Sequence, residues 1–183
     1  LHAIAAPLIT SAIDRVAYGG TDVRSCIRSS SSTSSSTATT TVDLGCGVGL
    51  STSEHGIGVD SSREMLRVAR ALHPRKTFVR GLAERWGEDG MAQTVTVAFL
   101  LHEQCPARRV RILKNAHRLC TRHVIVMDIH PSYRPSATML LGEPYIEGYL
   151  RNIDIEMRSI FSASVTSYDV IHGRVRVWNI TKI

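Results

Sequence analysis

Long hydrophobic runs are absent from this chain of 183 residues. Its longest apolar stretches have the length of a strand, as at 95–101, whereas a membrane-spanning helix needs about 18 or more apolar residues. We therefore expect no membrane span.

Cysteine is also scarce, and its positions show no pattern. The four cysteines form neither a Cys-x-x-Cys pair nor a regular spacing, so the sequence predicts neither a disulfide framework nor a zinc knuckle. This usage is typical of a reducing, intracellular setting. Because the chain begins with Leu1 rather than Met, a targeting segment and the compartment stay open.

Blocks of like charge and aromatic residues are few as well. Lys and Arg number 22 against 16 Asp and Glu, a net charge of +6, and aromatic residues make up 5% of the chain. The basic residues are spread along the sequence, whereas nucleic-acid interfaces cluster them and interleave aromatic side chains for stacking. We therefore expect no nucleic-acid partner. The sequence does not indicate which oligomeric state the protein adopts.

The N-terminal part differs in composition from the rest. Leu1–Val16 carries apolar residues at helical spacing, which predicts a short helix. Ser29–Thr41 consists of Ser and Thr apart from Ala38, a composition typical of a flexible linker. Since a chain of this length folds as one domain by default, we assign 1–40 to an extension and 41–183 to a single domain.

From residue 41 onward, short β-branched segments alternate with segments of helical periodicity. This alternation predicts an α/β fold with a doubly wound, mostly parallel sheet. The expected strands are Thr41–Leu44, Ile57–Asp60, Thr77–Val79, Thr94–Leu100 and Val124–Asp128, and the expected helices are Ser62–Leu72, Ala107–Leu119 and one within Pro144–Phe161. Two last strands, Ser164–Val170 and Arg174–Thr181, flank His172-Gly173 and predict an antiparallel C-terminal hairpin.

The most specific local signal is Asp43-Leu44-Gly45-Cys46-Gly47-Val48-Gly49, a hydrophobic strand that leads into three glycines at alternate positions. Glycine lets the backbone turn sharply and approach a ligand closely. A dinucleotide fingerprint requires the spacing Gly-x-Gly-x-x-Gly. The loop therefore predicts a ligand-binding turn, but not one for NAD or FAD.

A carboxylate ends the next expected strand, in Gly56-Ile57-Gly58-Val59-Asp60. Asp60 can accept both hydroxyls of a ribose, and Ser61 or Ser62 can cap the helix that follows. With the glycine loop, these residues resemble the class I S-adenosylmethionine-dependent methyltransferases, in particular the type 11 branch. Gly81-Leu82-Ala83-Glu84 and the strand before His102-Glu103 extend the resemblance over Thr41–Lys182.

The resemblance implies S-adenosyl-L-methionine as cofactor, methyl transfer to a small organic acceptor, and a seven-stranded sheet. It also implies that the glycine loop and Asp43 hold the methionine end, Asp60 the ribose, and Ala83 with Glu84 the adenine. The implied cofactor-binding residues are Asp43, Gly45, Gly47, Gly49, Asp60, Ser61, Ala83 and Glu84.

Candidates for catalysis follow the fourth expected strand. His102 stands at the carboxyl edge, where doubly wound sheets bind ligands, and is the first candidate for a general base, with Glu103 as the second. His102, Asp128 and His130 show no metal-ligand spacing, so the sequence predicts no metal site.

The chain departs from the family after the glycine loop. Only Leu50–His55 precedes Gly56, where the family has a helix of about three turns. A helix over this segment rises about 9 Å, less than the roughly 16 Å needed to return along a strand, so no crossover helix fits. A non-catalytic relative with a degraded cofactor pocket, acting as a binding module, therefore stays an alternative. A nucleic-acid methyltransferase is disfavoured, because His102-Glu103-Gln104-Cys105-Pro106 stands where an Asn-Pro-Pro-aromatic motif is expected.

Overall fold

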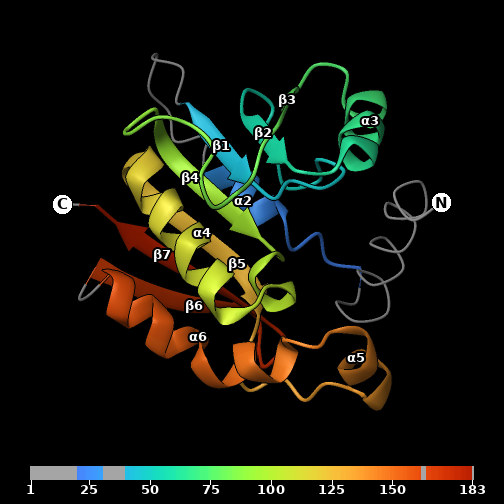
Figure 1. The fold of residues 1–183 in the computed structure, drawn as a ribbon, viewed down its shortest axis with the longest axis vertical. Helices are drawn as coiled ribbons and strands as arrows, with labels where there is room; N and C mark the ends of the chain where they lie inside the picture. Colours follow the sequence, from blue (N-terminus) through green and yellow to red (C-terminus); the bar gives the residue numbers. More distant parts are fainter. Residues whose placement is uncertain (1–19, 31–39, 162–163, 183) are drawn as a thin grey trace.

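A seven-stranded sheet forms the centre of the molecule, with strand order β3-β2-β1-β4-β5-β7-β6 (Figure 1). The computed structural model describes residues 20–30, 40–161 and 164–182. The expected helix Leu1–Val16 and most of the expected Ser/Thr linker lie outside these residues, although Ser29 and Ser30 belong to a helix. The strands are β1 (Thr41–Leu44), β2 (Ile57–Asp60), β3 (Thr77–Arg80), β4 (Ala92–Ala98), β5 (Cys120–Ile129), β6 (Val165–Ile171) and β7 (Val175–Thr181).

Helices cover both faces of this sheet (Figure 1). The helices of the described residues are α2 (Ser25–Ser30), α3 (Arg63–Leu72), α4 (Pro106–Leu119), α5 (Ala137–Gly142) and α6 (Ile146–Phe161), with a 3-10 turn, η1 (Leu101–Glu103), after β4; α5 itself buries no residue. The sequence patterns predicted α3, α4 and α6 but neither α2 nor α5, which are too short to show a periodicity. No helix of the described residues is long and apolar enough to cross a membrane.

The strand directions confirm the predicted doubly wound sheet. β1 pairs in parallel with β2 and β4, and β4 pairs in parallel with β5. β7 is antiparallel to both β5 and β6. The turn between β6 and β7 is closed by a hydrogen bond from Arg174 N to Ile171 O (2.9 Å) and contains Gly173 at a φ of +68°. Such a φ favours glycine, which is why His172-Gly173 could be recognised as a hairpin turn.

The connection from β1 to β2 contains no helix, and the structure describes all of it. Residues 45–56 run back across the sheet as turns and bends. Lys76 Nζ donates to Gly49 O (3.3 Å) and Thr52 O (2.7 Å), while Arg28 Nη1 of α2 donates to Leu50 O (2.8 Å). The expectation that no crossover helix fits is therefore confirmed, since non-helical backbone covers more distance per residue.

The two faces of the sheet differ because side chains alternate along each strand. On the face covered by α4 and α6, Val42, Leu44, Val95 and Val97 belong to a large apolar core. On the opposite face of β1 and β4 the buried side chains are polar, namely Thr41, Asp43, Thr94 and Thr96. The short connection covers this polar layer, where a crossover helix would need apolar partners.

Helix α4 buries one of its basic residues. Val110 is half-buried, whereas Arg109 is fully buried. Arg109 donates from Nε and Nη2 to the carboxylate of Glu156 on α6 (2.9 and 2.7 Å). A buried guanidinium requires such a bidentate partner, and Glu156 lies too far along the chain for periodicity to reveal it.

Candidate functional site

The glycine loop wraps around the end of β2. Gly45 N and Cys46 N both donate to Val59 O (2.8 and 3.0 Å), and Gly47 N donates to Asp60 Oδ2 (2.8 Å). Gly47 has a φ of +53°, and a Cβ atom there would meet no other atom within 4 Å. The backbone at Gly47 therefore faces open space directly beside the Asp60 carboxylate.

Asp60 lies half-buried at the carboxyl end of β2 with spare acceptor capacity. Its Oδ1 accepts from Ser62 N (2.8 Å) and its Oδ2 from Gly47 N. A carboxylate offers about four lone-pair positions, so each oxygen can accept a further hydroxyl. Ser62 is the N-cap of α3 and accepts from Met65 N (3.2 Å), whereas Ser61 is exposed beside it. The structure thus joins the two predicted signals, the loop and Asp60, at one edge.

Asp43 lies under the loop and is sealed from solvent. Oδ2 accepts from the hydroxyls of Ser51 (2.9 Å) and Thr52 (2.7 Å), and Oδ1 accepts from Thr96 (3.0 Å). Burial raises the pKa of this carboxyl above its usual range, and the three hydroxyl donors offset only part of the effect. The space enclosed around Asp43 and the 51–53 segment does not admit a water molecule.

Ala83 and Glu84 lie on the loop after β3. Glu84 Oε1 accepts from Arg108 Nε of α4 (2.9 Å), and Ala83 O accepts from Asn115 Nδ2 of the same helix (2.8 Å). These bonds anchor the loop to α4. No contact joins Ala83 or Glu84 to Asp60 among the described interactions, so their predicted place beside an adenine stays a prediction.

At the other end of the edge, His102 meets a carboxylate that the sequence analysis did not place in the site. Its Nδ1 lies 2.6 Å from Asp128 Oδ1, at the end of β5. Asp128 is fully buried and also accepts from the backbone N–H groups of Leu101 (2.8 Å), His102 (3.3 Å) and Ile129 (2.8 Å). The signal available in the sequence was the position of Asp128 next to the end of a central strand.

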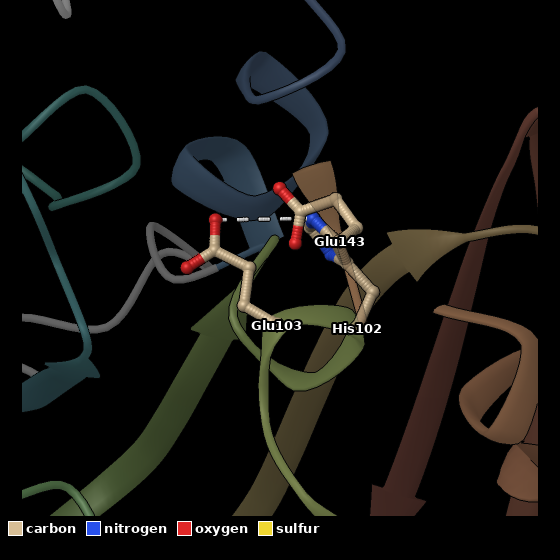
Figure 2. A group of neighbouring side chains, drawn as sticks. All are labelled: His102, Glu103 and Glu143. Carbon is tan, nitrogen blue, oxygen red and sulfur yellow. Dashed lines mark ion pairs between the residues drawn. The ribbon is translucent and has the colours of Figure 1, made fainter. Parts of the chain in front are cut away.

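This contact determines the charge of the ring. Burial of His102 disfavours the charged imidazolium, but the charge and hydrogen bond of Asp128 outweigh burial and raise the pKa of His102 to about 9. The charges of Glu103 and Glu143 also raise this pKa, and the His102 ring makes a T-shaped contact with the ring of Tyr149 of α6. Figure 2 shows Glu103 and Glu143 next to His102, with Glu103 Oε1 3.9 Å from Nε2.

The segment that carries His102 is held from behind by α4 and α6. Arg109 Nη1 donates to Gln104 O (2.8 Å), which fixes the residue after η1. Tyr149 is buried and donates from its hydroxyl to Ile129 O (2.8 Å), so it packs under the site, whereas Tyr145 is exposed. Tyr149 of α6 and Glu143, which follows α5, thus both lie near His102.

Comparisons with known proteins agree with this architecture. A family model described as a methyltransferase domain matches residues 41–123. No curated protein shows a significant sequence match to the chain. A solved SAM-dependent methyltransferase of Thermotoga maritima, described as a possible histamine N-methyltransferase, aligns with a TM-score of 0.68 at 16% identity, over 93% of this chain and 91% of that one.

Two further solved structures show the same fold. The magnesium protoporphyrin IX methyltransferase of Synechocystis with bound SAM has a TM-score of 0.60 at 15% identity, over 88% of this chain and 76% of that one. An S-adenosylmethionine-dependent methyltransferase of Mesorhizobium loti has a TM-score of 0.58 at 17% identity, over 79% and 91% of the two chains. At these identities the likeness establishes the fold, and the site must be argued from its own residues.

Proposed function

We propose that the chain is a class I S-adenosylmethionine-dependent methyltransferase that methylates a small organic acceptor, a proposal that its matched methyltransferase domain and its fold support. In this proposal the cofactor lies along the glycine loop and Asp60, and the acceptor lies at the His102 end of the same edge. The observation that carries the proposal is the open backbone at Gly47 beside a half-buried Asp60 with unused acceptor positions.

The residues at this end of the sheet fit the ribose of the cofactor. Asp60 uses one acceptor position on each oxygen, so two hydroxyls can still bind it. The bare backbone at Gly47 leaves room for the ligand, which any side chain at that position would fill. When bound, the cofactor supplies an electrophilic methyl group on a sulfonium.

Asp43 fits a direct contact with the cofactor less well than the resemblance implies. Among the described residues, the carboxylate of Asp43 accepts hydrogen bonds from Ser51, Thr52 and Thr96, and these residues cover it. A contact with an ammonium group would require the 51–52 segment to move away. We therefore assign Asp43 to positioning the glycine loop from below and Asp60 to contacting the cofactor.

At the acceptor end, we propose the reverse order of the two catalytic candidates, with Glu103 as the base in place of His102. Nδ1 of His102 is bonded to Asp128, and the pKa of about 9 keeps the ring protonated at neutral pH. The ring is therefore a donor that can orient an acceptor oxygen through Nε2. Glu103, which is exposed beside it, is the group able to take the proton released when the acceptor becomes methylated. Most of the rate enhancement comes from alignment of acceptor and methyl group.

Calorimetric titration with S-adenosylhomocysteine tests the cofactor half of the proposal. We expect micromolar binding by the wild type, a loss of affinity of at least about tenfold in Asp60→Ala, and no change in Glu88→Ala, an exposed acid outside the site. A folded wild-type protein that binds no S-adenosylhomocysteine would contradict the proposal and support a non-catalytic binding module instead.

A further inference from the structure

Three side chains with metal-ligand chemistry converge at the carboxyl end of β4. One ligand atom each of His102, Glu103 and Glu143 lies within 4.8 Å of the other two (Figure 2). His102 and Glu103 come from η1, and Glu143 directly follows α5. Two segments separated in sequence by β5 and α4 therefore meet at this point.

The histidine is already oriented for such a role. Asp128 holds Nδ1 at 2.6 Å, which turns Nε2 toward the two glutamates. His102 is 8% exposed, and among the described residues no hydrogen bond to Nε2 is present. In metal-binding histidines, a carboxylate often accepts a hydrogen bond from the ring nitrogen that does not bind the metal. This bond fixes the tautomer and the orientation of the ring.

The charge of the cluster also favours a cation. Asp128, Glu103 and Glu143 are three carboxylates around one imidazole, so the group is negative even when the ring is protonated. Glu143 is in addition the C-cap of α5, where the helix carbonyls already place partial negative charge. A divalent ion between the carboxylates would relieve this repulsion.

We propose that His102, Glu103 and Glu143 form a binding site for one divalent transition-metal ion, of which Zn²⁺ is the best match. One imidazole and two carboxylates are donors that Zn²⁺ accepts, at bond lengths of about 2.0–2.2 Å. The ligand atoms must approach one another by a small side-chain movement, which the exposed Glu103 and the half-buried Glu143 can make. Binding displaces any proton on Nε2 to the solvent.

Such an ion would have an open position for another ligand, because three protein ligands do not complete a tetrahedral site. Because His102 lies at the proposed acceptor end, the bound ion would hold an oxygen of water or of the acceptor in place of the Nε2–H group of His102. Metal binding does not require the cofactor, and it can be measured whether or not the proposed methyl transfer is correct.

The test uses the chelator-treated, dialysed chain of 183 residues without cofactor. Zn²⁺ binding is followed by calorimetry, and Co²⁺ binding by visible and near-ultraviolet absorption, since thiolate ligands would add a near-ultraviolet charge-transfer band that His and Glu ligands do not. Glu103→Gln and Glu143→Gln remove one ligand each from side chains that are not part of the core. Glu88→Gln makes the same chemical change at an exposed residue outside the cluster.

We expect one ion per chain without a thiolate band, and an affinity at least about tenfold weaker in Glu103→Gln and in Glu143→Gln. Glu88→Gln should bind like the wild type. No binding by the wild type, equal affinity in all four proteins, or a thiolate band would each overturn the proposal. Circular dichroism of each variant confirms that a lost affinity does not reflect unfolding.

Discussion

Two buried aspartates at the same edge of the sheet are satisfied in opposite ways. Asp43, within β1, accepts hydrogen bonds from three neutral hydroxyls, and its pKa is raised because burial outweighs them. Asp128, at the end of β5, accepts from three backbone N–H groups and faces the ring of His102. A buried carboxylate is stable as an ion only where a charge or fixed dipoles compensate it.

The comparison indicates different roles for the two carboxyl groups. The backbone N–H groups that donate to Asp128 cannot reorient, because the fold fixes them. The hydroxyls around Asp43 can rotate and donate to other acceptors. We therefore expect Asp128 to depend on its charge and Asp43 to tolerate losing it.

The largest effect is expected for Asp128→Asn. In this variant an NH2 group replaces one carboxylate oxygen and faces either a backbone N–H donor or the His102 ring. The buried ring also loses the negative charge that compensates its own charge. We expect the free energy of unfolding to fall by about 3–5 kcal/mol. Urea denaturation of both proteins at neutral pH measures this change. A loss below about 1 kcal/mol would contradict the assigned role of Asp128.

Asp43→Asn should have a much smaller effect and the opposite direction. An amide keeps the shape, needs no counter-charge and can pair with rotated hydroxyls of Ser51 and Thr52. We expect the variant to be at least as stable as the wild type at neutral pH, by up to about 1 kcal/mol. The same denaturation experiment measures it, and a large destabilisation would show that Asp43 is ionised and strongly stabilised.

The difference in the free energy of unfolding between Asp43→Asn and the wild type should depend on pH. Because the pKa of Asp43 is raised in the folded state, folding favours the protonated form, so its contribution to stability is present at low pH and lost as pH rises. The groups around it are Ser51, Thr52, Thr96, Cys46 and Lys76. The advantage of Asp43→Asn should therefore shrink as pH falls, which thermal unfolding between neutral and mildly acidic pH measures.

The smallest effect is expected for Ser51→Ala. It removes one of the three hydroxyl donors to Asp43 and leaves Thr52 on the same oxygen. We expect a loss of about 0.5 kcal/mol in the free energy of unfolding. In the Asp43→Asn background the loss should be smaller, because a neutral amide depends less on that donor. Equal losses in both backgrounds would show that Ser51 acts independently of Asp43.

Much of the fold was predictable because its signals are local. The β-branched runs, the helical segments and the turn at His172-Gly173 correspond to β-strands, helices and a hairpin in the structure. The helices α2 and α5 were not predicted, since neither is long enough for a periodic pattern. The burial of Arg109 was not predicted, because its partner, Glu156, lies on another helix.

One part of the candidate site could likewise be predicted from local sequence, and the other part could not. The glycine loop and Asp60 belong to motifs that lie close together in the sequence, and in the structure Gly47 N donates a hydrogen bond to Asp60 Oδ2. The pairing of His102 with Asp128, and the approach of Glu143, depend on loops after β4, β5 and α5. Local spacing carries no information about such contacts, because they arise only when strands align at one edge.

By itself, the sequence determined the order of strands and helices, the glycine turn, the position of Asp60 and the absence of a crossover helix. These follow from side-chain periodicity, glycine geometry and chain length, which act over a few residues. Only the tertiary structure decided that Asp43 is covered by hydroxyls and that Asp128 sets the charge of His102. Both outcomes depend on burial and on partners distant in sequence, which exist only once the sheet has formed.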